Sequence, residues 1–499
     1  MKRRTSGART HPAPGPLRGV LPLLFLALLV VALAAPAGIA IAPAFLGPDR
    51  SAAAAAPPAP WQQVPTHLNS PDHTGGIGPL SDGAAVPATG PLSALLNDTL
   101  KSEGAGTFTG VVQDAATGQL LFDRSGDEAR VPASNMKLLT ASAALRILGP
   151  DRRFSTKVVA GPTPGSLVLT GGGDVLLGEG ESAPGAVLGH AGLTTLARAT
   201  VRALQDEGTT GTVSVLLDDS LFTGPSLNPA WSPEDVEAGE MAPLFPLAMN
   251  SARFDPAKNT GPRPQDAAMS TAAAFSAQLS AAAAAAGLAV APGVVRVPPG
   301  PAVSAPDAGE ARVLAEVHSA TVGQQVDLLL RASDNYLTEA MGRMSALASG
   351  RPGSNDGAIA AVLQELKDMG IPTDTLRAAD VSGLALANRV SARQLAEVVR
   401  TITSGPDTRL RAALAGFPVA GLTGTLGDRY TDVSTAGGAG LVRAKTGTLN
   451  TVIALSGYVV DADGRLLVFS FIGNGLSPGA ANKAALDRAA SVLAGCGCR

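Results

Sequence analysis

The spacing of apolar residues predicts a helix, a hairpin and a second helix at the start of the folded chain. Four leucines within residues 92–100 recur at helical intervals, because residues three or four apart share one face of a helix. Strand-like runs follow at 107–113 and 119–123, joined by a turn at 116–118. A helical pattern then begins after Ala133.

The same patterns continue through the middle and the end of the chain. Short β-like runs alternate with Gly/Pro-rich connections in the middle of the chain, where an Ala-rich helix is also expected. Two further helices follow, and the chain ends in a hairpin and a helix. In chain order the expected strands are 166–170, 213–217, 294–297, 451–459 and 465–472, and the expected helices are 270–287, 324–331, 336–348 and 480–493. Interleaved helices and strands indicate an α/β (α+β) fold.

The first ninety residues differ in character from the rest. Residues 1–46 combine a basic start with an uncharged stretch that begins at Gly19, which predicts an export signal that is either cleaved or kept as a membrane anchor. Residues 47–90 are dominated by Ala, Pro, Gly and Ser and are expected to form a linker. The folded remainder is therefore expected outside the cytoplasm, either membrane-anchored or secreted.

Composition removes several classes of function. With 38 Lys+Arg against 41 Asp+Glu and only 3% aromatic residues, nothing favours nucleic acid as a partner. Only His190 and His318 among the histidines fall in the expected folded part, and the sole cysteines, Cys496 and Cys498, have no metal-binding spacing. We therefore expect no metal and no organic cofactor. A Gly-x-Ser-x-Gly motif at 475–479 lacks the later histidine that an α/β-hydrolase needs.

One tetrapeptide, Ser134-Asn135-Met136-Lys137, places a serine and a lysine one helical turn apart. These side chains share a helix face and are within hydrogen-bonding reach. A neutral lysine activates a serine hydroxyl by taking its proton. Because a free lysine has a pKa of about 10.4, the site must lower the pKa of Lys137 by burial and by a nearby second cation. A helix start with a solvated lysine would also explain the tetrapeptide.

Two further motifs follow. Ser333-Asp334-Asn335 lies between two helical patterns and offers a hydroxyl and an amide, although such a tripeptide is also an ordinary helix cap. Lys445-Thr446-Gly447-Thr448 begins a strand-like run. There the lysine and the hydroxyls would meet a carboxylate, and Gly447 would let a substrate backbone approach. A polar strand start is the alternative.

The ordered set Ser-x-x-Lys, Ser-x-Asn, Lys-Thr-Gly resembles the signature of active-site-serine β-lactamases and penicillin-binding proteins. The long interval between the first two motifs is similar to that of the low-molecular-mass class C D-alanyl-D-alanine carboxypeptidases/endopeptidases, peptidase family S13. Other stretches also resemble that family, although Val175 and Val381 depart from its usual pattern. These stretches are 131–134, 171–174, 217–222, 335–339, 382–384, 388–391 and 424–426.

The resemblance implies a role for each motif residue. Ser134 would be the acylated nucleophile and Lys137 its base, with Ser333 and Asn335 forming a second wall. Lys445, Thr446 and Thr448 would face a peptide carboxylate, and the N–H groups of Ser134 and Thr448 would form an oxyanion hole. Asp174 would lie either in the cleft or in a turn at a strand end.

The resemblance also implies an architecture and a substrate. A transpeptidase-like domain would consist of residues 91–158 and 310–499, with a five-stranded antiparallel sheet between helices. Residues 159–309 would form a mainly β insertion. The substrates would be peptidoglycan stem peptides or cross-links, and β-lactams would acylate the same serine. A β-lactamase and a catalytically silent envelope scaffold remain the alternatives.

Overall fold

The computed structural model describes residue 80 and residues 83–258, 260–298, 312–477 and 479–497. The predicted export segment and most of the predicted linker lie outside these ranges. Within the described part of the chain, no helix is both long enough and apolar enough to cross a membrane.

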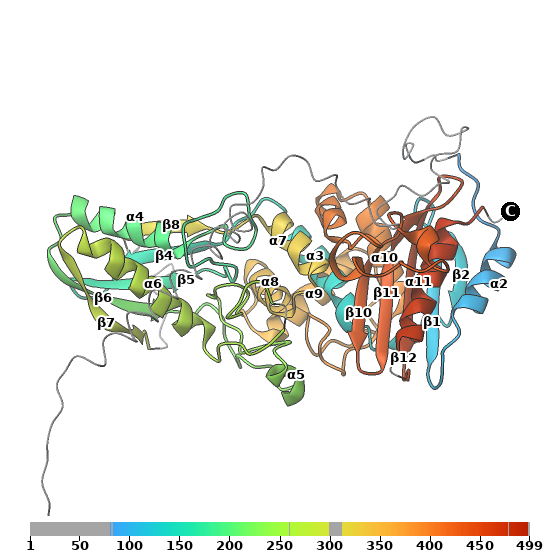
Figure 1. The fold of residues 1–499 in the computed structure, drawn as a ribbon, viewed down its shortest axis with the longest axis horizontal. Coiled ribbons are helices and arrows are strands. Elements are labelled where there is room, and N and C mark those ends of the chain that lie inside the picture. The colour runs from blue at the N-terminus through green and yellow to red at the C-terminus, as the bar shows by residue number, and fades with distance from the viewer. Residues whose placement is uncertain (1–79, 81–82, 259, 299–311, 478, 498–499) are drawn as a thin grey trace, which may run out of the picture. The chain divides into compact units, whose positions relative to one another are not determined.

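A five-stranded antiparallel sheet is built from the two ends of the described chain (Figure 1). Its strand order is β10-β11-β12-β1-β2. The strands are β1 (Thr107–Asp114), β2 (Leu120–Arg124), β10 (Arg443–Leu449), β11 (Val452–Val460) and β12 (Leu466–Asn474). This is the sheet that the resemblance implied, and it places the Lys445 motif on an edge strand.

Alternating side chains give this sheet two apolar faces. On β12, Phe469 and Phe471 pack with α2 (Thr89–Thr99) and α11 (Ala480–Ala494), whereas Val468 and Ile472 join the core that contains α10 (Ala392–Ser404). Successive residues of a strand point to opposite faces, so a continuous apolar run such as β12 is buried on both sides.

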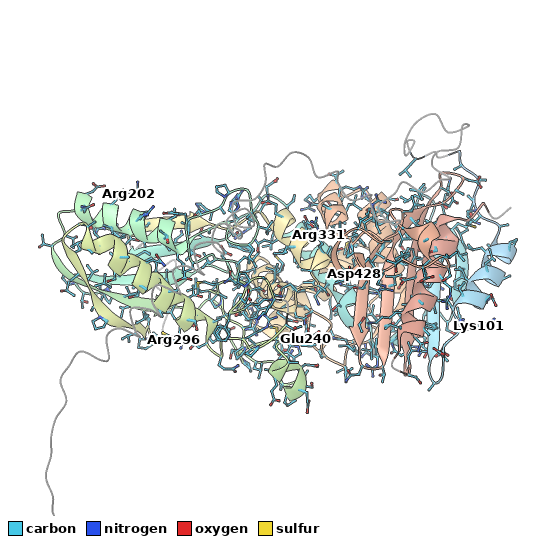
Figure 2. All side chains as sticks on the ribbon, viewed as in Figure 1. Lys101, Arg202, Glu240, Arg296, Arg331 and Asp428 are labelled. Atoms are coloured by element: carbon cyan, nitrogen blue, oxygen red, sulfur yellow. The ribbon has the colours of Figure 1, made fainter. Side chains whose placement is uncertain are left out.

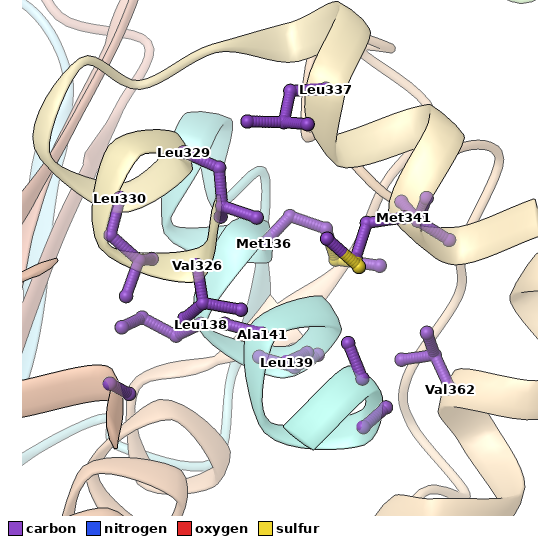
Figure 3. Close-up of a cluster of buried hydrophobic side chains, with 14 of the residues drawn as sticks. Met136, Leu138, Leu139, Ala141, Val326, Leu329, Leu330, Leu337, Met341 and Val362 are labelled. Carbon is purple, nitrogen blue, oxygen red and sulfur yellow. The ribbon is translucent and has the colours of Figure 1, made fainter. Parts of the chain in front are cut away.

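A helical core beside the sheet positions the first two motifs (Figure 3). The helix α3 (Met136–Ile147) is surrounded by α7 (Val322–Arg331), α8 (Asn335–Ala348) and α9 (Asn355–Asp368), and all but its last two residues are buried. Met136, Leu139, Leu329 and Met341 meet in this core. Because α3 is enclosed on all sides, a polar side chain on it such as Lys137 is taken out of water.

A second five-stranded sheet comes from the middle of the chain, in the order β7-β6-β5-β4-β8. Its strands are β4 (Ser155–Ala160), β5 (Ser166–Gly171), β6 (Gly211–Asp218), β7 (Leu288–Arg296) and β8 (Val313–His318). The pairs β5–β6 and β6–β7 are parallel and the others antiparallel. The helices α4 (Leu193–Asp206) and α6 (Ala267–Ala284) share an apolar core with this sheet.

This second sheet differs in two respects from the insertion that we predicted. Its strands span residues 155–318 and so extend past the expected boundaries at 159 and 309. With α4 and α6 it also has more helix than a mainly β region. The division of the chain into domains stays a prediction.

The remaining elements are short. They are α5 (Pro233–Glu237), the two-residue strands β3 (Ala129–Arg130) and β9 (Val390–Ser391), which pair with each other, and the 3₁₀ helices η3 (Ala133–Asn135), η4 (Thr408–Gly416), η5 (Gly424–Leu426) and η6 (Ala436–Gly438). The helices that the sequence predicted coincide with α2, α3, α6, α7, α8 and α11 within a few residues.

Candidate active site

A tight turn before α3 presents Ser134. The serine lies in η3, and the residue before it, Ala133, has a φ of 47°, a left-handed conformation that costs a non-glycine residue about 1 kcal/mol or more. The turn packs against Gly383, where a Cβ atom would come within 1.9 Å of the Ala133 carbonyl oxygen. Backbone strain held in place by close packing is common where a chain displays a reactive side chain.

Lys137 points at the serine from the first turn of α3. Its Nζ lies 3.0 Å from Ser134 Oγ, 2.6 Å from Asn335 Oδ1 and 2.7 Å from the Ser382 carbonyl oxygen. The side chain is fully buried. Burial lowers the pKa of Lys137 to about 8, against the opposing effect of nearby carboxylates. A substantial fraction of this amine is therefore neutral near physiological pH, as a general base requires.

The second motif forms the loop between α7 and α8. Ser333 has a φ of 57°, and Asp334 caps α8 by accepting the N–H of Leu337 at 2.9 Å. The Asp334 carboxylate also accepts hydrogen bonds from Ser251 and Arg253, both at 2.8 Å. These contacts fix the loop so that Asn335 meets Lys137.

The third motif runs along β10 with its lysine buried. Lys445 Nζ donates to Ser333 Oγ at 2.9 Å and to the Thr446 carbonyl oxygen at 2.7 Å. Burial, and secondly the charge of Lys137, lower the pKa of Lys445 well below its usual value. The Thr446 hydroxyl is hydrogen-bonded to that of Thr425 at 2.6 Å. The structure thus brings together all eight predicted site residues.

Gly447 permits the close approach of β10 to the nucleophile turn. A Cβ atom at this position would lie 2.9 Å from the Pro132 carbonyl oxygen, 3.0 Å from Ala133 Cβ and 3.2 Å from Ser134 N. We had attributed this glycine to an approaching substrate backbone. The structure supplies a different requirement, because the turn that carries Ser134 already occupies the space.

We expect Gly447→Ala to slow acylation of Ser134 by roughly 10–100-fold, since a displacement of about 1 Å in a reacting group can cost that much. The measurement is the second-order rate constant for labelling by a fluorescent penicillin. Gly437→Ala is the matched control, because a Cβ atom there meets nothing within 4 Å. Equal rates for the two variants would contradict the packing argument.

A polar pocket of about 270 Å³ opens beside these residues. Ser134, Ser333, Asn335, Thr446 and Thr448 line it, which leaves Lys137 and Lys445 buried behind its wall. The remaining lining residues are polar or charged apart from Ala332; they are Glu240, which Figure 2 labels, Arg253, Thr260, Arg263, Thr425, Arg429 and Lys483. A pocket so rich in hydroxyl and cationic groups suits an anionic peptide end.

Several of these residues were not predicted from the sequence. Glu240, Arg253 and Arg263 are distant from every motif, and Ser382 contributes a main-chain oxygen that any residue type could supply. Thr425 lies in a stretch that was cited only for its resemblance to the family. Asp174 does not line the pocket. It is 1% exposed and accepts the N–H of Leu176 at 2.9 Å, which is the role of a turn at a strand end.

Two other kinds of site find no support among the described residues. No group of three or more His, Cys, Asp or Glu side chains in the described ranges could hold a metal ion. Ser477, of the Gly-x-Ser-x-Gly motif, accepts the N–H of Ala105 at 3.3 Å and is not in the pocket. The pocket's own Ser–Lys pair is therefore the candidate nucleophile and base.

A serine with a buried lysine, a Ser-x-Asn loop and a Lys-Thr-Gly edge strand define a serine acyl-transfer enzyme of the class that includes β-lactamases and penicillin-binding proteins. Residues 92–298 and 257–494 match the model of the D-Ala-D-Ala carboxypeptidase 3 (S13) family. The chain belongs to this family. The predicted family, the α/β fold class and the serine carboxypeptidase class are therefore confirmed.

Relatives of the chain are similar over most of its length. A carboxypeptidase of Mycobacterium tuberculosis is 36% identical over 85% of this chain and 88% of its own, and the carboxypeptidase DacB of Mycolicibacterium smegmatis is 34% identical over 94% and 95%. The crystal structure of penicillin binding protein 4 from Haemophilus influenzae has the same fold. It aligns with a TM-score of 0.64 at 20% identity, covering 79% of this chain and 97% of that one.

Proposed function

We propose that this chain hydrolyses D-alanyl-D-alanine ends or cross-links of peptidoglycan stem peptides through an acyl-enzyme on Ser134. One observation carries the proposal: the buried amine of Lys137 lies 3.0 Å from the Ser134 hydroxyl at the wall of a cationic pocket. The D-Ala-D-Ala carboxypeptidase family to which the chain belongs supports this substrate class, and the two similar carboxypeptidases support the reaction type.

Acylation begins when neutral Lys137 takes the proton of Ser134 Oγ, which attacks the carbonyl carbon of the penultimate D-Ala. The resulting oxyanion is held by the N–H groups of Ser134 and Thr448, which line the same pocket. The scissile C–N bond then breaks and the leaving D-Ala amine takes up a proton. That proton is the one that Lys137 took from Ser134, and the Ser333 hydroxyl, which lines the same pocket, is suited to relay it. Water then attacks the ester carbonyl carbon while neutral Lys137 takes its proton and passes it to the departing Ser134 Oγ, which releases the shortened peptide and regenerates Ser134.

The terminal carboxylate of the substrate is placed on the β10 side of the pocket. Lys445 lies behind this wall, and the hydroxyls of Thr446 and Thr448 line it. Hydroxyl donors close to a lysine bind a carboxylate by charge-assisted hydrogen bonds. Asn335, which accepts from Lys137 and donates to the Glu240 carbonyl oxygen at 3.0 Å, keeps the base aligned between the two walls.

Acylation should rise with pH as Lys137 loses its proton. The pKa of Lys137 is about 8, and only the neutral amine accepts the serine proton. We therefore expect the acylation rate constant to increase about tenfold per pH unit well below pH 8 and to level off above it. Stopped-flow labelling with a chromogenic β-lactam between pH 5.5 and 9.5 measures this profile. A flat profile would exclude Lys137 as the base.

We also propose that the enzyme works outside the cytoplasm. The basic, then apolar, segment at residues 1–46 supports export, and the peptidoglycan substrate lies in the cell envelope. Retention of that segment as a membrane anchor is tested by fractionation: a retained anchor keeps the full-length chain in the membrane after a salt wash, whereas cleavage releases a shorter chain.

Intact mass after brief exposure to benzylpenicillin tests the function itself. One persistent penicilloyl adduct per chain, with release of D-Ala from a D-Ala-D-Ala peptide, is the expected result. Consumption of the penicillin without an adduct would instead indicate a β-lactamase. If neither an adduct nor turnover is found, the non-catalytic scaffold is the only interpretation that remains.

A further inference from the structure

A buried carboxylate lies behind the general base without touching the pocket. Glu339 follows Asn335 by one turn of α8 and is 2% exposed. Its Oε1 accepts the N–H groups of Val381 at 3.1 Å and of Ser382 at 2.8 Å. A buried carboxylate costs free energy unless its hydrogen bonds are satisfied, so this one holds the 381–382 segment firmly to α8.

The same segment holds Lys137 from its other side. The Ser382 carbonyl oxygen accepts from Lys137 Nζ at 2.7 Å, and the Val381 carbonyl oxygen accepts from the Thr140 hydroxyl at 2.6 Å. The N–H groups of the segment therefore bond to α8 and its carbonyl oxygens to α3. Of the acceptors Ser134 Oγ, Asn335 Oδ1 and the Ser382 carbonyl oxygen, only the last is a main-chain atom, and Glu339 fixes where it lies.

We propose that Glu339 is a positioning residue for the general base: through the Ser382 peptide it sets the orientation of the Lys137 amine. This inference rests on the proposed function of Lys137. It assigns Glu339 no contact with substrate.

The charges around Lys137 determine in which direction its pKa should change when Glu339 loses its charge. After burial, the groups that act on its pKa are four carboxylates, all of which raise it: Asp380, Asp334, Glu339 and Glu240. Burial, and secondly the charge of Lys137, lower the pKa of Lys445 on β10 well below its usual value. Glu339 in turn faces Asp380 and Arg343. Burial and then Asp380 raise the pKa of Glu339 to about 7, and this is opposed by a hydrogen bond from the Ser382 side chain, by the Val381 N–H group and by Arg343.

Glu339→Gln keeps the size of the side chain and one oxygen acceptor but removes the negative charge. We expect the plateau rate of acylation to fall by roughly 10-fold or more, because a neutral amide oxygen binds the two N–H groups more weakly than a carboxylate and Lys137 is then held less accurately. The rising limb of the pH profile should move to lower pH, because an ammonium that loses an anionic neighbour gives up its proton more easily. A purely structural residue would lower stability without moving this limb.

Asp174→Asn is the matched control. Asp174 is also a buried carboxyl that accepts a backbone N–H, and burial raises its pKa to about 7, but it is not among the groups that act on Lys137. The Asp174→Asn enzyme should keep the wild-type plateau rate of acylation and the wild-type position of the rising limb of the pH profile. Thr140→Val is the second test, because it removes the other anchor of the segment without changing charge. This substitution should lower the plateau rate of acylation and leave the rising limb of the pH profile in place.

The experiment measures acylation by a chromogenic β-lactam between pH 5.5 and 9.5, with each rate expressed per penicillin-titrated site. A slower Glu339→Gln enzyme with a shifted limb supports the inference. A wild-type rate and limb in Glu339→Gln would overturn it and leave Ser134 catalysis intact. Where Glu339→Gln does not fold, an unchanged plateau in Thr140→Val overturns it instead. No acylation of the wild type would refute the proposed function and the inference with it.

Discussion

Replacing Ser134 with alanine should abolish the penicilloyl adduct and lower peptide hydrolysis on the order of 10³-fold or more. The variant keeps Lys137, both threonines and the oxyanion donors but has no nucleophile, and enzymes that lose their serine nucleophile retain only the catalysis of binding and the oxyanion hole. Intact mass with benzylpenicillin reports the adduct, and release of D-Ala from a D-Ala-D-Ala peptide reports hydrolysis.

The fold should survive this substitution. Ser134 is only half-buried, and its side chain makes one hydrogen bond, to Lys137. Ser477→Ala is the control, since Ser477 belongs to the Gly-x-Ser-x-Gly motif that resembles a hydrolase elbow and lies outside the pocket. An adduct that persists in Ser134→Ala and disappears in Ser477→Ala would reverse the assignment of the nucleophile.

Elements with strong periodicity were predictable from the sequence. The Ala-rich helix α6 and the β11–β12 hairpin lie within a few residues of the predicted ranges, because an uninterrupted pattern between clear turn residues specifies its own structure. The helices α4, α9 and α10 were not predicted. α10, for example, begins at a Ser391–Gln394 capping box, a local signal that could have located it.

The active site was predictable to the extent that its chemistry depends on side-chain type. A lysine three residues after a serine and a Lys-Thr-Gly strand are rare in a chain with few lysines, and the motifs could be found without knowledge of the fold. Glu339 and Ser382 lie in two of the stretches that resemble the family, 335–339 and 382–384, but the roles of the Ser382 carbonyl oxygen and the Glu339 carboxylate could not be found in this way. One is a main-chain atom, and the other acts only through a segment 42 residues away in sequence, so the fold alone brings them to Lys137.

Replacing Lys137 with methionine should lower the acylation rate on the order of 10³-fold or more. The neutral amine is the proposed proton acceptor for Ser134, and a thioether cannot take that proton. The residual rate should also lose the plateau that the wild type reaches above pH 8. Lys367→Met is the control, since Lys367 is exposed on the last turn of α9. A Lys137→Met enzyme with the wild-type rate would assign the base to another group, with Lys445 the next candidate.

The same variant tests whether folding lowers the pKa of Lys137. Burial lowers its pKa from 10.5 to about 8, so between these values the unfolded chain binds more protons at this residue than the folded one. Stability therefore increases with pH across this window. Relative to Lys137→Met, the wild type should gain roughly 2 kcal/mol of unfolding free energy between pH 7.5 and pH 10. Urea denaturation of both proteins at the two pH values measures the gain. A constant difference between them would mean that Lys137 titrates as an ordinary lysine, and a lysine that is charged at neutral pH could not activate Ser134.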